Sequence, residues 1–439
     1  MKLSIIQPSH YRSRSDRSPC RMRKRQLIGL TLPYLAALTP PGWEITLIDE
    51  QLTGLDFGAP VDLVAITTWT INSFRAYEIG DTFRRRGVPV IMGGPHTYFY
   101  PEESAAHCDA VGVGEGETIW PAMLEDFLHG RLKKLYRAPH LQDLSNLPMP
   151  RYDLLDLSRY GFVKTYSVQA SRGCPFECEF CSERFHLGHR YRCRPVEDVI
   201  AEIRESRARY VFFADSNFSG RPAHTMELME ALIPLKIRWS ALWPAYLCKD
   251  QKLMDLAAKS GLLHLNLGLE SIDQETLAGM RKTNNKVGQY REILENLRKR
   301  EISYSLNFIF GWDTEREDIF SSTLAFLRGE RVPAAYFNIL TPHKGTPLYD
   351  RMMAEDRIID ADDIGRWPGI RCHIKPKYCS PRELEERVMA MHREFYRYSS
   401  MLARLPLPIK LTGIASWMVN FSQRKVSRPG EEMENFDRY

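Results

Sequence analysis

Three cysteines lie in one short stretch of the chain, at Cys174, Cys178 and Cys181. Three residues separate the first pair and two separate the second, so one loop can wrap all three thiolates around a small inorganic cluster. A [4Fe–4S] cluster normally takes four cysteine ligands, so three ligands leave one iron open to another molecule. An open coordination position distinguishes a reactive metal site from a closed structural one. The spacing therefore predicts a reactive iron–sulfur cluster.

A zinc site is the alternative interpretation of the same cysteines. Zinc prefers four nitrogen or sulfur ligands, commonly supplied by paired C-x2-C units. Cys193 or His186 could supply a fourth ligand, but the sequence contains no second C-x2-C pair. The cysteine loop therefore favours an iron–sulfur cluster over zinc.

The cysteines follow the first of six strand-like segments, and helix-like segments alternate with these strands. The strands are expected at 165–169, 210–214, 238–242, 264–268, 305–310 and 335–340. The helices are expected at 196–206, 223–232, 252–259, 274–279, 287–300 and 316–329. This alternation predicts a partial (β/α)6 barrel over residues 161–350, with its chemistry at the C-terminal ends of the strands.

A second series of strands and helices precedes the barrel. The strands are expected at 3–7, 44–49, 63–68, 89–92 and 110–113, and the helices at 25–37, 71–86, 102–107 and 118–129. Five such strands predict a flavodoxin-like or Rossmann-like domain with a parallel sheet over residues 1–135, joined to the barrel by a linker at 136–160. Ligands of such sheets bind beyond the carboxyl ends of the strands.

Small and polar residues follow three strands of this first domain. They are Thr67, Thr68, Gly93, Gly94, Gly114, Glu115 and Gly116. Each group alone is compatible with a plain turn. Because glycine lets the backbone approach a ligand closely, three such exits on one edge together indicate a binding edge.

The C-x3-C-x2-C motif resembles the hallmark of the radical S-adenosylmethionine (SAM) superfamily. The segments GLESID at 268–273, NFIFGWDTE at 307–315 and TPHKGTPLY at 341–349 are similar to family segments that follow the fourth, fifth and sixth barrel strands. The resemblance implies that the open iron binds SAM, which an electron then cleaves to methionine and a 5′-deoxyadenosyl radical. It implies SAM contacts at Phe180, Asp215, Glu270, Ser271, Asn307 and Gly311. Asn307 stands where glycine is commoner in the family.

The first domain resembles the cobalamin-binding (B12-binding) domain that precedes many radical SAM barrels. The similar segments are GGPH at 93–96 and VGVGEGE at 111–117. The resemblance implies that a corrinoid lies over the glycine-bearing edge, in contact with the seven small and polar residues named above. The Asp-x-His-x-x-Gly motif that ligates cobalt elsewhere is absent, and His10 lacks its context. Cobalt could bind without a histidine, or the domain could have lost cobalamin.

Three functions are compatible with these resemblances. The leading one is cobalamin-dependent methylation of an unactivated carbon in a small-molecule substrate, with electrons from an external flavodoxin-type or ferredoxin-type reductant. The second is radical cyclisation or rearrangement of the anaerobic porphyrin-ring cyclase type, since fold does not separate these reactions. The third is a non-catalytic iron–sulfur protein. No residue is assigned as a catalytic acid or base.

Composition and the C-terminal region set the remaining expectations. The chain has 439 residues and a net charge of +5, which argues against a dedicated nucleic-acid binder. No signal peptide or membrane span is recognised, which predicts a cytoplasmic protein. A helical extension is expected over 351–439, with helices at 381–404 and 409–425. The latter helix is expected to pack on the barrel, and peripheral membrane contact is the alternative because it carries Trp417 between basic ends.

Overall fold

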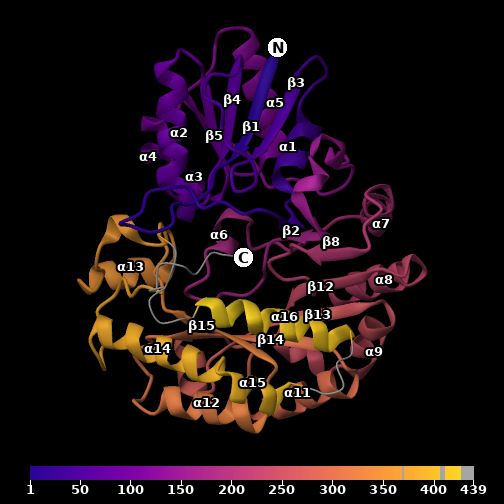
Figure 1. The fold of residues 1–439 in the computed structure, drawn as a ribbon, viewed down its shortest axis with the longest axis vertical. Helices are drawn as coiled ribbons and strands as arrows, with labels where there is room; N and C mark the ends of the chain where they lie inside the picture. Colours follow the sequence, from indigo (N-terminus) through magenta and orange to yellow (C-terminus); the bar gives the residue numbers. More distant parts are fainter. Residues whose placement is uncertain (368–369, 406–410, 427–439) are drawn as a thin grey trace.

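The computed structural model describes residues 1–367, 370–405 and 411–426. Figure 1 shows an N-terminal sheet domain above a larger sheet that curls into part of a barrel. Both sheets are parallel and both have helices on their faces, as the alternating sequence pattern predicts. The predicted fold class is therefore confirmed.

The N-terminal sheet has the strand order β3-β1-β4-β5-β6-β7. Its strands are β1 (Lys2–Gln7), β3 (Glu44–Asp49), β4 (Leu63–Thr67), β5 (Val90–Gly93), β6 (Ala110–Val113) and β7 (Leu135–Arg137). The first five follow the flavodoxin order, in which the order of adding strands reverses at β1: β3 lies on one side of β1, and β4, β5 and β6 follow on the other. Ligands of such sheets bind at this switch point, beyond the carboxyl ends of the strands. The sixth strand, β7, was not predicted, because three residues are too short to show a pattern.

Helices cover both faces of this sheet. They are α1 (Thr31–Leu38), α2 (Ser73–Arg85), α3 (Pro95–Phe99), α4 (Pro101–Ala106) and α5 (Gly116–Leu128). One apolar core joins α1 and α5 to the sheet, and another joins α2 to the opposite face. Burial on both faces explains why the central strands β4, β5 and β6 are almost continuously apolar rather than alternating.

The barrel sheet contains the six predicted strands in sequential order. They are β8 (Tyr160–Val168), β11 (Tyr210–Phe213), β12 (Arg238–Trp243), β13 (Leu262–Glu270), β14 (Ser303–Phe310) and β15 (Ala334–Ile339). The helices outside them are α7 (Val196–Glu205), α8 (Pro222–Leu232), α9 (Gln251–Lys259), α10 (Gln274–Gly279), α11 (Tyr290–Lys299) and α12 (Ile319–Gly329). One apolar core runs through this whole unit.

The helix expected at 25–37 is wrong in its first part. Residues Arg25–Ile28 form a strand, β2, which pairs in parallel with β8 and becomes the seventh strand of the barrel sheet. Ile28 is fully buried in the barrel core. The first strand of an open barrel has an unpaired edge, and β2 covers it with backbone hydrogen bonds. A segment from the N-terminal region thus completes the barrel, which the local sequence pattern does not reveal.

The C-terminal extension is helical, as predicted, but divided differently. Its helices are α13 (Pro347–Ala354), α14 (Pro381–Phe395), α15 (Tyr398–Arg404) and α16 (Leu411–Val426). The single helix expected at 381–404 is interrupted where Arg397 adopts an extended conformation, and α13 was not predicted. Helix α16 packs on β13, β14 and β15, as expected. Within the described ranges, every helix is too short or too polar to span a bilayer.

Candidate active site

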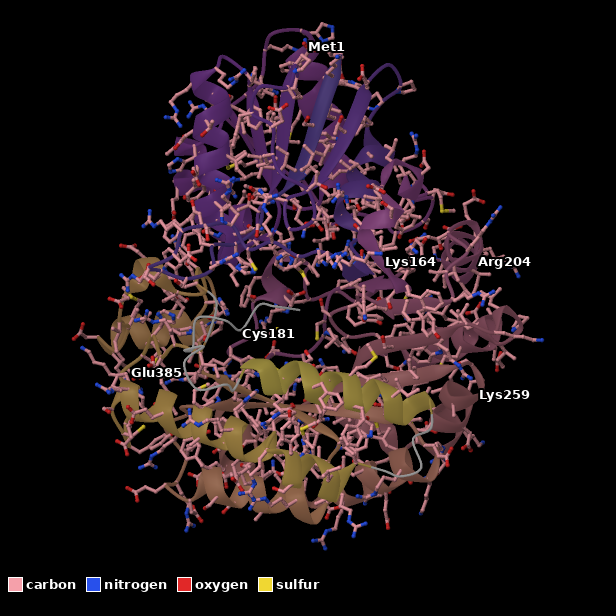
Figure 2. The ribbon with its side chains drawn as sticks, in the orientation of Figure 1. Met1, Lys164, Cys181, Arg204, Lys259 and Glu385 are labelled. Atoms are coloured by element: carbon pink, nitrogen blue, oxygen red, sulfur yellow. The ribbon has the colours of Figure 1, made fainter. Side chains whose placement is uncertain are left out.

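The three cysteines lie in a loop held shut by a small antiparallel ladder. Strand β9 (Ser171–Arg172) enters the loop and pairs with β10 (Arg192–Cys193), which leaves it, and a short helix, α6 (Glu183–His186), lies between them. Cys178 is buried, whereas Cys174 and Cys181 are partly exposed. Figure 2 shows Cys181 between the N-terminal domain and the barrel. The loop therefore presents its thiols to the space that the two units share.

The thiols of this loop must lose their protons before they can bind a metal or a cluster. Burial raises the pKa of Cys178, and it raises the pKa of Cys181 to about 11. These thiols therefore keep their protons until metal binding displaces them. Among the described residues, no three His, Cys, Asp or Glu side chains form a group that could hold one metal ion. Cluster ligands bind different irons and need not converge on one point.

Asp215 ties the cysteine loop to the end of β11. Its fully buried carboxylate accepts hydrogen bonds from the Ser171 hydroxyl and, at 3.2 Å, from the Ala170 amide. Burial raises the pKa of Asp215 to about 7, although these hydrogen bonds oppose the rise. The observed role of this carboxylate is to position the loop, and its contact with SAM stays a prediction.

A cavity of about 310 Å³ opens beside the cysteine loop at the carboxyl ends of β13, β14 and β15. It is lined by Phe180, Glu270, Ile309, Asn338, Ile339, Leu340, Thr341, His343, Ile370 and Arg371. Two of the predicted SAM contacts, Phe180 and Glu270, therefore share one cavity. The apolar residues from β14 and β15 suit a planar ring, and Glu270 suits hydroxyl or ammonium donors.

Glu270 is held in an unusual backbone conformation at the end of β13. Its φ is 67°, and the pairing of β13 with β14 shifts register at this point. Its carboxylate lies 3.1 Å from the ammonium of Lys282. Burial alone lowers the pKa of Lys282, but attraction to Glu270, Cys178 and Cys181 together outweighs burial and leaves the pKa raised, so the ammonium stays charged. Left-handed backbone in a non-glycine residue is strained, and such residues cluster at functional sites.

The other predicted SAM residues do not line this cavity. The hydroxyl of Ser271 accepts from the amide of Asp273 at 3.1 Å, and Asn307 donates to the side chain of Asn266 across the strands. Gly311, with a φ of 110°, donates its amide to Glu315 at 2.7 Å. These residues shape the ends of β13 and β14, and their direct contact with SAM stays a prediction.

The predicted corrinoid edge carries tight turns and an orphaned hydroxyl. Gly94 has a φ of 107°, and a Cβ at this position would lie 2.8 Å from the backbone of Thr68. Thr67 and Gly93 end the paired strands β4 and β5 beside it. The hydroxyl of Thr68 is buried and has no hydrogen-bond partner among the described residues. A buried polar atom without a partner fits a site completed by a bound molecule.

Glu115 joins the corrinoid edge to the cysteine loop. Its carboxylate lies 2.7 Å from Arg192 and 3.3 Å from Arg172, and Glu117 lies 2.6 Å from Arg172. We call these four residues the junction cluster. Each of the four side chains is less than a tenth exposed. Both arginines flank the cysteine loop, so this cluster connects the two predicted cofactor sites directly, and contact of Glu115 with cobalamin stays a prediction.

The remaining glycines of this edge have separate structural roles. Gly114 has a φ of 103°, and a Cβ there would lie 2.8 Å from the Cβ of Ala138. Gly116 begins α5. On the other side of the junction, Arg366 from the C-terminal extension makes two 2.6 Å contacts with Glu103 and is almost fully buried. The two units are thus fastened on both sides of the space between them.

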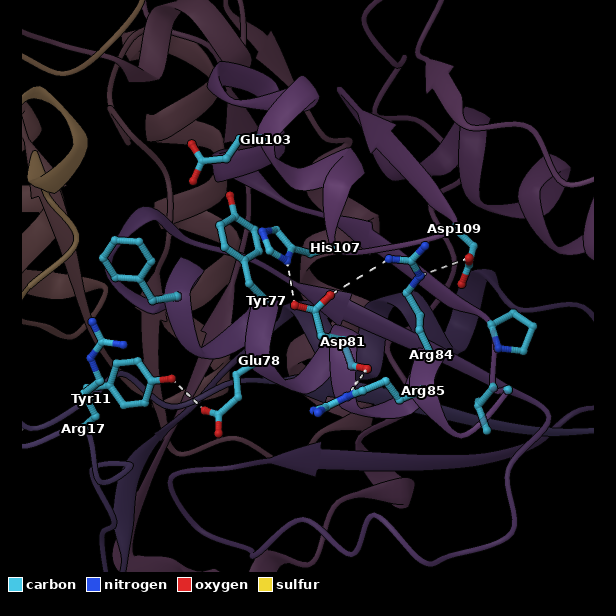
Figure 3. Close-up of a pocket in the computed structure, with 14 residues that line it drawn as sticks. Tyr11, Arg17, Tyr77, Glu78, Asp81, Arg84, Arg85, Glu103, His107 and Asp109 are labelled. Carbon is cyan, nitrogen blue, oxygen red and sulfur yellow. Dashed lines mark hydrogen bonds and ion pairs between the residues drawn. The ribbon is translucent and has the colours of Figure 1, made fainter.

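A separate hollow of about 1180 Å³ lies beside α2, away from the cysteine loop. Figure 3 shows that charged groups lining it face one another. His107 lies 2.8 Å from Asp81, and Arg84 lies 3.2 Å from Asp109. These four groups pair with one another, whereas Arg17 and Arg85, which also line the hollow, form no ion pair among the described residues.

Comparison with known proteins agrees with this site. Residues 168–327 match the model of the Radical SAM superfamily. The chain is 31% identical to bacteriochlorophyllide d C-12(1)-methyltransferase from Chlorobaculum tepidum, over 91% of this chain and 88% of that protein. The chain belongs to the radical SAM superfamily. As a radical SAM enzyme it uses a [4Fe–4S] cluster and SAM, acts on a small molecule and needs an electron donor.

Two further relatives extend the comparison of this radical SAM chain. It is 25% identical to the anaerobic magnesium-protoporphyrin IX monomethyl ester cyclase from Cereibacter sphaeroides, over 70% of this chain and 55% of that protein. The solved structure of the radical SAM methyltransferase TsrM from Kitasatospora setae, with cobalamin and a [4Fe–4S] cluster bound, gives a TM-score of 0.66. That match covers 88% of this chain and 84% of TsrM at 17% identity, which shows a shared fold.

Sequence reasoning missed several residues of the radical SAM site. Lys282 pairs with Glu270, and Glu315 accepts from Gly311. Glu179, between the second and third cysteines, is held by Arg351 of α13 through contacts of 2.8 and 3.2 Å. A signal was present for Glu315, which ends the segment similar to the fifth-strand motif, and for Glu179, which lies inside the cysteine motif. Lys282 and Arg351 carry no such signal.

Proposed function

We propose that this radical SAM enzyme methylates an unactivated carbon of a small molecule, with cobalamin as the methyl carrier. The observation that carries the proposal is the junction cluster, which links the corrinoid-type edge to the cysteine loop through buried ion pairs. Glu115 lies one residue beyond Gly114 on that edge, and Arg172 lies two residues before Cys174. Two cofactors bound at these places would face one shared space. The similarity to a methyltransferase over nearly the whole chain supports the same reaction.

Each part of the site has a role in this proposal. When bound, the cluster with SAM supplies a radical that removes a hydrogen atom, and the corrinoid supplies the methyl group. Cys174, Cys178 and Cys181 would hold the cluster. Phe180 and Glu270 would orient SAM in the cavity beside it, and the Lys282 ammonium would balance the charge of Glu270 and attract the carboxylate of SAM.

The first domain would hold the corrinoid at the carboxyl ends of β4, β5 and β6. The proposed contacts are Thr67, Thr68, Gly93, Gly94, Gly114, Glu115 and Gly116. Backbone at Gly94 and Gly114 can approach a large ring closely because neither residue has a side chain. The shared fold with a cobalamin-bound structure supports a corrinoid at this edge. An external flavodoxin-type or ferredoxin-type protein would deliver the electron.

The test uses anaerobically reconstituted full-length protein with iron, sulfide, hydroxocobalamin and a strong reductant. SAM labelled in its methyl group is added, and two products are measured: 5′-deoxyadenosine, and label transferred to the protein-bound corrinoid. We expect both products. Deoxyadenosine without label on the corrinoid would remove the methyl-carrier role and leave cyclisation or rearrangement. Bacteriochlorophyllide d, named in the relative, is the first substrate probe, and label in that pigment would identify it as a substrate.

A variant series assigns the two products to their sites. Thr68→Val removes the orphaned hydroxyl without changing side-chain shape, and we expect weaker cobalamin retention with unchanged deoxyadenosine formation. Glu270→Gln should reduce both products, because both require SAM. Equal loss of both products in Thr68→Val would contradict the assignment of this edge to the corrinoid.

A further inference from the structure

Helix α16 has an apolar stripe that the rest of the described chain leaves uncovered. Ile414, Met418 and Phe421 are 46%, 47% and 49% exposed, and their spacing places them on one face of the helix. Large apolar side chains in a row, each half exposed, mark an interaction surface more often than scattered single ones do. In Figure 1 the helix lies in front of β13 to β15, with its ribbon uncovered.

The opposite face of α16 shows which end of the barrel it covers. Ser416 contacts the hydroxyl of Ser303 at 2.8 Å, and Asn420 donates to the carbonyl of Pro333 at 2.7 Å. Ser303 begins β14, and Pro333 immediately precedes β15. The helix therefore lies across the N-terminal ends of the barrel strands, opposite to the end that carries the cysteine loop.

The turns at this same end of the barrel are strongly basic. The turns that lead into β11 to β15 and the helix ends beside them carry eleven arginines and lysines: Arg204, Arg207, Arg209, Lys236, Arg238, Lys259, Arg298, Lys299, Arg300, Arg328 and Arg331. They carry four glutamates: Glu205, Glu230, Glu301 and Glu330. Among the described residues, only Arg298, Arg300 and Arg328 of these cations form ion pairs. Figure 2 labels two of the others, Arg204 and Lys259, on one side of the molecule.

Three of these cations occupy strained backbone positions. Arg207, Lys236 and Arg331 have φ values of 52°, 52° and 47°, in the left-handed region that glycine or asparagine normally fills after a helix. Gly261 fills this position in the turn before β13. The helix dipole favours a cation in the last helical turn, but it does not require one at the left-handed residue. Glu301, with a φ of 56°, fills the same position in the turn before β14, so the turns do not need a cation there.

We propose that this end of the barrel docks on an anionic lipid surface. Ile414, Met418 and Phe421 would enter the boundary between headgroups and acyl chains, and the surrounding cations would meet the phosphates. A nucleic acid would match the cations but would leave the apolar stripe in water. A second copy in a two-fold dimer would match the stripe but would bring like charges together. The inference does not depend on methyl transfer, because the cysteine loop lies at the opposite end.

The test is co-sedimentation of the reconstituted protein with vesicles. One set is phosphatidylcholine alone, and the other contains an equal share of phosphatidylglycerol. We expect the protein to bind the anionic vesicles about tenfold more tightly than vesicles of phosphatidylcholine alone. Binding to the anionic vesicles should weaken as the salt concentration is raised. The double variant Met418→Glu, Phe421→Glu and the triple variant Arg207→Gln, Lys236→Gln, Arg331→Gln should each lose most of this binding.

Matched controls make the same chemical changes elsewhere. The double variant Leu128→Glu, Leu135→Glu alters two residues of the N-terminal domain that are 52% and 43% exposed. A triple glutamine variant of the exposed residues Lys24, Arg86 and Arg137 removes equal charge from the N-terminal domain. Both controls should bind vesicles normally, and all variants should form deoxyadenosine at the normal rate, which shows that they fold.

Three results would overturn the proposal. The first is equal binding to both vesicle types, and the second is binding that survives both designed variants. The third is a dimer without vesicles that Phe421→Glu converts to monomers, because the stripe would then belong to a second copy.

Discussion

The two ends of the barrel use arginine in opposite ways. At the end that carries the cysteine loop, Arg172 and Arg192 are 9% exposed and each is paired with a carboxylate of the N-terminal domain. At the other end, Arg207 and Arg331 are exposed and form no ion pair within the described residues. A buried charge without its partner is costly, so the first arrangement constrains geometry, whereas exposed charges contribute little to stability and remain open to a partner.

This contrast separates residues that position cofactors from residues that face outward. Substitutions in the junction cluster should disturb stability and the relation between the two cofactor sites. Substitutions at the opposite end should leave stability and the relation between the cofactor sites almost unchanged. Each prediction below tests one side of that division, and the first three concern the cysteine-loop end.

Replacing Cys178 with alanine has the largest expected effect. The variant removes one of three cluster ligands, so iron content should fall and deoxyadenosine formation should drop to background. Cys193→Ala is the matched control, since this cysteine lies on β10 at the margin of the same loop. The control should retain iron and activity. A functional cluster in Cys178→Ala, or zinc in the native protein, would contradict the assignment of the loop.

Arg192→Met should reduce activity less than Cys178→Ala does, but it should lower the unfolding free energy more than any of the other variants. It leaves the Glu115 carboxylate buried with a weakened set of partners, and breaking such a pair costs about 3 kcal/mol of unfolding free energy. Denaturant unfolding measures this loss. If the junction cluster sets the distance between the cofactor sites, label transfer to the corrinoid should fall more than deoxyadenosine formation, which needs the barrel alone. A parallel decrease of both would indicate a purely structural role.

The sequence predicts the parts of this molecule that depend on local interactions. It does not predict the parts that depend on contacts between distant segments of the chain. The strands at 44–49 and 110–113 were predicted to the residue, because apolar runs between turns are a local signal. Strand β2 was missed, since its stability depends on an edge of β8 more than a hundred residues away. In the site, the cysteine motif was legible because its ligands share one loop. The Glu115–Arg192 pair spans 77 residues, and no local pattern records it.

Arg351→Met should have a moderate effect on the same loop. Arg351 makes a two-pronged contact with Glu179 but is a third exposed, so its loss should cost about 1 kcal/mol of unfolding free energy. The loosened loop would misplace the open iron relative to the SAM cavity. We expect a raised KM for SAM with a smaller change in kcat, and partial rescue by Arg351→Lys. A fall in kcat alone would argue against this positioning role.

Arg207→Gly has the smallest expected effect, and it should raise the unfolding free energy rather than lower it. Glycine accepts the left-handed conformation of residue 207 without strain, so the unfolding free energy should rise by about 0.5 kcal/mol, after the greater freedom of glycine in the unfolded chain is subtracted. The same variant should bind anionic vesicles more weakly, because one cation of the basic end is lost. Arg207→Lys keeps both the charge and the strain, and should change neither property. Greater stability combined with weaker vesicle binding would show that this end of the barrel retains a charge that its fold does not need. A glycine variant that is less stable would mean that Arg207 supports the turn itself, and the division between the two ends of the barrel would no longer hold.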